Sequence, residues 1–305
     1  MRSGWYQVAY LKELKNAVTP LEVEKPLIAV KHGTQVRIFD AICPHRGAHL
    51  GYGGELTADG IVCPFHAKTI RMGAEKPCAQ ECGSGYYVNE YQTLTIGGLV
   101  FVLIPPADKP DLPNVLRQLD QDHFFVPGFT LRVQAPAELI IENGFDATHF
   151  HPVHQVCRHP DLSVVESRFG ELRATGTFLL PPTKWQQKIT DTNVIPVPYT
   201  ALGLSPGIIL SQLAGESPYW VLTSATPLSK KEALLRLSVI VPPGADGKAP
   251  SPSSCEYLLS QSQKGLQSDL TIWRHMDHSS PSRYAPEDGA VIEFRRFLNR
   301  FPVSA

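Results

Sequence analysis

Apolar and polar residues alternate in short runs through the first third of the chain, and longer periodic segments follow. Runs bounded by Gly and Pro turns occupy residues 27–31, 35–39, 93–96 and 99–104. Such runs predict a small antiparallel β domain. Further strand-like runs cover residues 173–180, 184–190, 220–225 and 234–241, and helical patterns cover residues 136–149, 255–275 and 286–300. The pattern therefore predicts an α+β chain whose second part contains a central antiparallel sheet.

A proline-rich segment separates the two parts. Residues 105–113 contain four prolines, which cannot continue a strand or a helix interior. We therefore expect an N-terminal domain over residues 1–108 and a second domain over residues 109–305. The segment 242–254, rich in Pro, Gly and Ser, predicts a loop.

Composition excludes several classes of protein. A chain of 305 residues with 43% hydrophobic residues can bury a sizeable core, and a net charge of −1 gives no footprint for nucleic acid. No apolar run approaches the ~18 residues of a membrane span, and the first residues lack the apolar core of a signal peptide. We expect a cytoplasmic protein in which Cys78, Cys82, Cys157 and Cys255 are free thiols.

Two short segments carry the strongest chemical signal. Cys43-Pro-His45 and Cys63-Pro-Phe-His66 are separated by 17 residues. Two cysteines and two histidines hold a [2Fe–2S] cluster of the Rieske type, with the cysteines on one iron and the histidines on the other. The same residue types can bind zinc, but zinc fingers group the cysteines together and the histidines together. Because each segment here supplies one of each, the spacing favours the cluster.

A second group lies in the expected helix at residues 136–149. Asn143, Asp146 and His149 are three residues apart, so they share one helix face. Pro152 then ends or kinks the helix, which lets His154 turn back toward His149. Two imidazoles and one carboxylate bind Fe(II) and leave open positions for O₂. The alternative is a polar surface turn or a set of core histidines.

The carboxylate of this iron site must come from elsewhere. The C-terminal helical patterns offer five acids: Glu256, Asp269, Asp277, Glu287 and Asp288. Asp269 falls in the apolar stripe with Leu266 and Trp273, where a lone acid is costly unless it is paired or bound to a metal. Asp269 is therefore favoured, whereas Glu287 and Asp288 suit the beginning of the last helix.

Four segments resemble Rieske non-haem iron oxygenases, most closely the bacterial 3-ketosteroid 9α-hydroxylases and related sterol-modifying enzymes. They are residues 41–54, residues 142–154 and the C-terminal runs 269–275 and 287–297. One departure lies after His66, where the family has a small residue, Trp, an aromatic and Asp, but this chain reads Ala67-Lys68-Thr69-Ile70. The resemblance implies an all-β Rieske domain followed by a helix-grip (START-like) catalytic domain, in a head-to-tail homotrimer.

The resemblance also assigns roles. Cys43, His45, Cys63 and His66 would hold the cluster, and His149, His154 and Asp269 would hold the mononuclear iron. Asp146 would be a bridging carboxylate that accepts hydrogen bonds from His149 and from the cluster ligand His66 of a neighbouring subunit, with Asn143 beside it.

The expected activity is O₂-dependent hydroxylation of a hydrophobic, polycyclic or sterol-like substrate, in a pocket built from residues 179–241. The alternatives are O- or N-demethylation, desaturation, or a Rieske electron carrier without catalytic iron. The chain contains no flavin or nicotinamide fingerprint. Electrons from NAD(P)H would therefore arrive through a separate ferredoxin or flavin reductase.

Overall fold

The computed structural model describes residues 1–15, 17–73, 85–107, 110–158, 160–167, 170–181, 194–215, 218–244 and 246–303. The expected strand at 184–190 and the expected thiols Cys78 and Cys82 lie outside the described residues.

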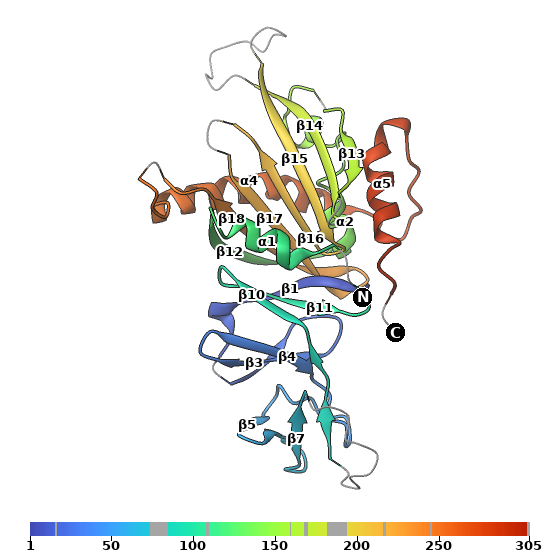
Figure 1. The fold of residues 1–305 in the computed structure, drawn as a ribbon. Helices are drawn as coiled ribbons and strands as arrows, with labels where there is room; N and C mark the ends of the chain where they lie inside the picture. Colours follow the sequence, from blue (N-terminus) through green and yellow to red (C-terminus); the bar gives the residue numbers. More distant parts are fainter. Residues whose placement is uncertain are drawn as a thin grey trace.

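Three small sheets form the N-terminal part. The first has the order β1-β11-β10 and consists of β1 (Gly4–Tyr10), β11 (Leu99–Ile104) and β10 (Thr93–Ile96). The second consists of β2 (Val18–Leu21), β3 (Leu27–His32), β4 (Gln35–Asp40) and β9 (Glu90–Tyr91). The third consists of β5 (Glu55–Thr57), β6 (Gly60–Val62), β7 (Thr69–Met72) and β8 (Tyr87–Val88). The four strands expected from the sequence are confirmed, and the third sheet forms the tip farthest from the large sheet (Figure 1).

A seven-stranded antiparallel sheet forms the second part, in the order β12-β18-β17-β16-β15-β14-β13. Its strands are β12 (Phe124–Val133), β13 (Ser163–Glu166), β14 (Leu172–Leu180), β15 (Ile195–Ser205), β16 (Ile208–Leu213), β17 (Trp220–Ser229) and β18 (Glu232–Val241). The expected central antiparallel sheet is therefore confirmed. The pattern did not predict β12, because Pro127 interrupts its alternation at a point where the pairing register shifts.

Helices flank this sheet. They are α1 (Leu112–Leu119), α2 (Ala137–Glu142), α3 (Phe150–His154), α4 (Pro252–His275) and α5 (Gly289–Leu298), with short 3₁₀ turns η1 (Leu11–Glu13) and η2 (Pro286–Asp288). The last two expected helices are confirmed, although α4 begins inside the expected loop at 242–254. The expectation that the proline-rich segment 105–113 contains no helix is wrong, because α1 begins within it. Pro113 occupies the first turn of α1, where no backbone N–H is needed, and the Asp111 side chain accepts from the Asn114 N–H at 3.2 Å.

The N-terminal part packs directly on the large sheet through β1 (Figure 1). One buried core joins side chains of both parts, including Trp5 and Phe101 with Leu204 and Leu222. Hydrogen bonds support this contact, such as Ser205 Oγ donating to the Trp5 carbonyl at 2.7 Å. The expected boundary after residue 108 stays a prediction, since residues 108–109 are not described.

Candidate metal centres

The two Cys–His segments lie on neighbouring loops of similar shape. The first follows β4 and the second joins β6 to β7. In each loop the cysteine carbonyl accepts from the N–H four residues later, Gly47 at 2.9 Å and Ala67 at 3.0 Å. In both turns the residue that donates this hydrogen bond has a left-handed backbone conformation, with φ of 77° at Gly47 and 53° at Ala67. The matching turns bring Cys43 and Cys63 together in one buried core cluster, each 2% exposed.

The two histidines of these loops face each other. The ring centroids of His45 and His66 are 4.7 Å apart in an edge-on arrangement. Nδ1 of His45 is buried and has no hydrogen-bond partner among the described residues. The pKa of His45 is lowered by desolvation and by Lys68, His66 and Arg46 nearby. A neutral imidazole with an orphaned buried nitrogen, beside two buried thiols, fits the ligand set of a Rieske cluster.

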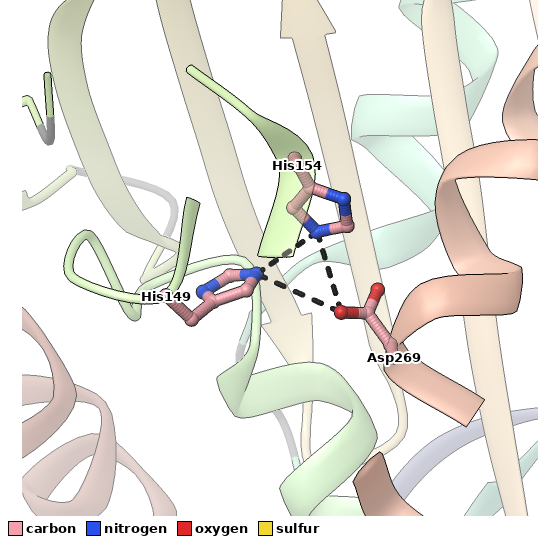
Figure 2. A group of neighbouring side chains, drawn as sticks. All are labelled: His149, His154 and Asp269. Atoms are coloured by element: carbon pink, nitrogen blue, oxygen red, sulfur yellow. Dashed lines mark hydrogen bonds and ion pairs between the residues drawn. The ribbon is translucent and has the colours of Figure 1, made fainter. Parts of the chain in front are cut away.

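A second set of candidate metal ligands lies where α3 and α4 meet, in the second part of the chain. Figure 2 shows His149, His154 and Asp269 turned toward one another. Nε2 of His154 lies 3.2 Å from Nε2 of His149 and 3.3 Å from Oδ1 of Asp269, and His149 Nε2 lies 3.9 Å from the same oxygen. The three ligand atoms lie within 4.8 Å of one another. Such convergent lone pairs repel unless a proton or a metal ion lies between them, so the donor set fits a divalent iron.

The tautomer of His149 supports metal binding. Its Nδ1 lies 2.6 Å from the backbone carbonyl oxygen of Asp146, which can only accept, so Nδ1 carries the proton and Nε2 is free. Nδ2 of Asn143 lies 3.1 Å from that Nε2 and can donate to it. The pKa of His149 is lowered, chiefly by burial, which keeps the ring neutral. The protonated Nδ1 and the neutral ring are what an imidazole needs in order to bind a metal through Nε2.

The local backbone differs from the expected continuous helix. α2 ends at Glu142, and α3 begins only at Phe150 and contains Pro152 rather than ending there. Asp146 explains the break, because its Oδ1 accepts from the N–H of Thr148 at 3.1 Å and from its hydroxyl at 2.8 Å. A side chain that satisfies backbone donors in this way competes with the helix. Asn143 and His149 therefore meet across a turn and not along one helix face.

The structure also corrects the bonding expected of Asp146. The His149 ring donates to the Asp146 carbonyl, and the Asp146 carboxylate Oδ2 lies 3.7 Å from Nδ1, too far for a hydrogen bond. The side chain of Asp146 is 32% exposed. The Asp146 side chain is therefore partly open to solvent.

Asp269 lies where the apolar stripe predicted it. The buried residues of α4 are Leu266, Asp269 and Trp273, and Asp269 is 7% exposed. Glu256, Asp277, Glu287 and Asp288 do not join His149 and His154: within the described residues, Asp269 is the one acid in this potential metal-binding group.

Two residues beside the site were missed from the sequence. Glu142 is 8% exposed, and its carboxylate forms an ion pair with Nε of Arg295 on α5. Burial raises the pKa of Glu142 and the Arg295 guanidinium opposes this rise. Glu142, Asp146 and His149 line a cavity of about 140 Å³ behind the histidines. An acid directly after the apolar pair Ile140-Ile141 was the one sequence signal for this buried position.

A larger cavity of about 400 Å³ opens on the other side of the group. Asp269, His154 and Asn143 contribute to its wall, and most other wall positions are apolar or aromatic. Strands β15, β16 and β17 supply much of the wall, which agrees with the expected location between residues 179 and 241. Tyr199 is fixed there because its hydroxyl donates to the Gly144 carbonyl at 2.8 Å.

Comparison with known families identifies the architecture. Residues 104–301 match the family of 3-ketosteroid 9α-hydroxylase C-terminal domains, and residues 4–82 match the Rieske [2Fe–2S] domain. The first match covers well over half of the chain. The chain belongs to this family of Rieske oxygenases. It is an oxygenase component with an iron–sulfur domain and an iron-dependent catalytic domain.

Individual relatives agree with this assignment. The oxygenase is 24% identical over 329 residues to a 3-ketosteroid-9-alpha-monooxygenase oxygenase component of Rhodococcus rhodochrous, covering 98% of this chain and 80% of the relative. It is 23% identical over 320 residues to cholesterol 7-desaturase of Bombyx mori, covering 98% and 69%.

Solved structures share the fold. Dicamba monooxygenase bound to 3,6-dichlorosalicylic acid superposes with a TM-score of 0.74 at 17% identity, covering 98% of this chain and 96% of that one. The oxygenase of a carbazole 1,9a-dioxygenase–ferredoxin complex gives 0.71 at 16% identity, covering 98% and 89%. No helix in the described part of this oxygenase is long and apolar enough to cross a membrane.

Proposed function

We propose that this oxygenase uses O₂ to hydroxylate a polycyclic or sterol-like substrate at iron held by His149, His154 and Asp269. The observation that carries the proposal is that His154 and Asp269 line a largely apolar cavity of about 400 Å³. Nε2 of His149, the third ligand atom, lies 3.2 Å from His154 Nε2 and 3.9 Å from Asp269 Oδ1. An apolar pocket that ends at a reactive centre holds a C–H bond close to that centre.

Each residue has a distinct task in this proposal. Iron supplies O₂ activation when bound, and the cluster held by Cys43, Cys63, His45 and His66 supplies electrons. The Asp146 carbonyl fixes the His149 tautomer, since it accepts from Nδ1 at 2.6 Å. Nδ2 of Asn143 lies 3.1 Å from Nε2 of His149 and can donate to it only while iron is absent, because that nitrogen has one lone pair and would use it to bind the metal.

The cavity wall indicates the shape of the substrate. Ser262, Leu266 and Asp269 recur on one face of α4, so the wall extends about two helical turns, ~11 Å, from the iron ligand. Gln212 and Gln261 also line the cavity, and neither side-chain amide forms a hydrogen bond within the described residues. An elongated apolar molecule with one hydrogen-bonding group at its outer end fits this wall. The steroid and sterol names of the two relatives agree with that shape.

The source of electrons lies outside the single chain. The cluster loops precede β5 and join β6 to β7, and Figure 1 places β5 and β7 at one tip of the molecule, away from α4, which carries Asp269. We infer that a homotrimer brings the cluster of one chain to the partly exposed Asp146 of the next. The carbazole 1,9a-dioxygenase oxygenase is known in complex with a ferredoxin. A ferredoxin or flavin reductase, supplied by NAD(P)H in the cytoplasm, is therefore the proposed donor.

A single-turnover experiment tests the proposal. The holoprotein is chemically reduced without air and then mixed with ¹⁸O₂ and one compound from a panel of sterols, ketosteroids, planar arenes and small cationic amines. We expect one labelled oxygen in a sterol or ketosteroid product, and none with the His154→Ala variant. Labelled product from the amines alone would overturn the substrate class.

Desaturation is the second candidate, because one relative is named as a cholesterol desaturase. The same mass spectra separate the outcomes. A hydroxylated product gains one oxygen, a desaturated product loses two hydrogens, and a demethylated product loses its methyl group.

A further inference from the structure

The His45 side of the cluster loops has an aromatic cover that comes from outside both loops. The sequence after His66 places Lys68 where the family has Trp, yet the ring of Tyr86 lies 5.3 Å from the ring of His45. Tyr86 immediately precedes β8 and packs on the core cluster that contains Cys43 and Cys63.

Pairing of β7 with β8 fixes this ring. The Arg71 N–H donates to the Tyr86 carbonyl at 2.9 Å, next to the parallel pair Arg71 and Tyr87. The ring is half-buried, whereas His66 on the other side is exposed. Tyr86 thus excludes water from the His45 side of the loops.

A cation holds the cover from outside. Nζ of Lys68 lies 5.2 Å from the centre of the Tyr86 ring, within range for a cation–π contact. Because the Tyr86 ring lies 5.3 Å from the His45 ring, the same ammonium group also lies near this cluster ligand. Lys68 therefore places a positive charge beside the proposed cluster ligand and also fixes the ring that covers it.

We infer that Tyr86 and Lys68 together replace the missing Trp: the tyrosine ring shields the cluster, and the lysine charge raises its reduction potential. The inference rests on the cluster site at Cys43, His45, Cys63 and His66. Reduction adds one negative charge to the cluster, so a nearby cation stabilises the reduced form. The tyrosine ring has a separate effect, because it keeps water and O₂ away from the cluster and so slows its breakdown.

Potentiometric titration of the holoprotein, followed by the visible spectrum and by electron paramagnetic resonance, tests the lysine. We expect Lys68→Met to lower the reduced-to-oxidised ratio at a fixed poise about tenfold, which is ~59 mV for one electron. Lys68→Arg keeps the charge and should restore the ratio to within about twofold of wild type. Lys25→Met is the matched control, because Lys25 makes a similar contact of 5.6 Å with Tyr91 in another sheet.

The rate at which the visible spectrum bleaches in air tests the tyrosine. Tyr86→Leu should bleach several-fold faster than wild type, and Tyr86→Phe, which keeps the ring, should match wild type. Equal potentials in Lys68→Met, Lys25→Met and wild type would overturn the role of Lys68. Equal bleaching of Tyr86→Leu and wild type would overturn the cover.

These readouts need neither substrate nor mononuclear iron. A wild-type protein without any cluster spectrum would refute the cluster assignment itself. A protein with a normal cluster that fails to hydroxylate would refute the proposed function and leave the inference standing.

Discussion

Replacing Arg295 by Met tests the charge balance behind the iron site. Glu142 and Arg295 form an ion pair between α2 and α5, and the side chain of Glu142 is only 10% exposed. Burial raises the pKa of this carboxyl, and Arg295 is the first group that lowers it again. Arg295→Met therefore leaves a buried carboxylate without its compensating charge.

The expected cost follows from that burial. Breaking a fully buried pair by removing one partner costs about 3–5 kcal/mol. We expect no more than ~3 kcal/mol at neutral pH, because the Arg295 side chain is 35% exposed and the carboxyl can escape by protonation. With an m-value of ~3 kcal/mol/M, the urea midpoint falls by about 1 M. In the variant the folded pKa of Glu142 lies well above its unfolded value of ~4.3. The penalty is therefore absent below the unfolded pKa, grows as the pH rises from that value to the folded pKa, and stays constant above it.

Urea unfolding followed by tryptophan fluorescence at a series of pH values measures this effect. Glu142→Gln/Arg295→Met removes the buried charge and should recover most of the lost stability at neutral pH. A midpoint for Arg295→Met that matches wild type, or a double variant no more stable than the single one, would refute the reasoning.

Three further variants separate the two centres. Asp269→Ala should lower affinity for mononuclear iron at least 100-fold while the cluster stays reducible, and full iron loading would contradict its assignment. Asp146→Asn should keep both centres loaded but slow cluster reoxidation by substrate and O₂ by orders of magnitude, measured by rapid mixing; loss of iron instead would make Asp146 a ligand. Cys63→Ser should abolish the visible spectrum without changing the thermal unfolding of the large sheet, and an intact spectrum would exclude the Rieske assignment.

Local sequence signals predicted which candidate ligands lie close together. Each cluster loop carries its own Cys and His within four residues, so their meeting depends on one short turn repeated twice. Asp269 was identified because helical periodicity alone places it among Leu266 and Trp273, and both neighbours are indeed buried.

Contacts between residues far apart in the sequence could not be predicted from local patterns. Arg295 reaches Glu142 only because α5 packs on α2, and Tyr86 reaches His45 only through the pairing of β7 with β8. The break between α2 and α3 was missed for a different reason. Asp146 has spacing compatible with a helix, but its side chain bonds to Thr148 and ends the regular structure.

The metal content of the purified holoprotein tests the central claim most directly. Iron and acid-labile sulfide are measured per chain for wild type and for His149→Ala/His154→Ala, beside the visible spectrum. The two-centre account predicts about three iron atoms and two sulfides in wild type, and about two of each with an unchanged spectrum in the double variant. Two irons and two sulfides in a fully loaded wild type would instead describe an electron carrier, and zinc without sulfide would contradict both centres.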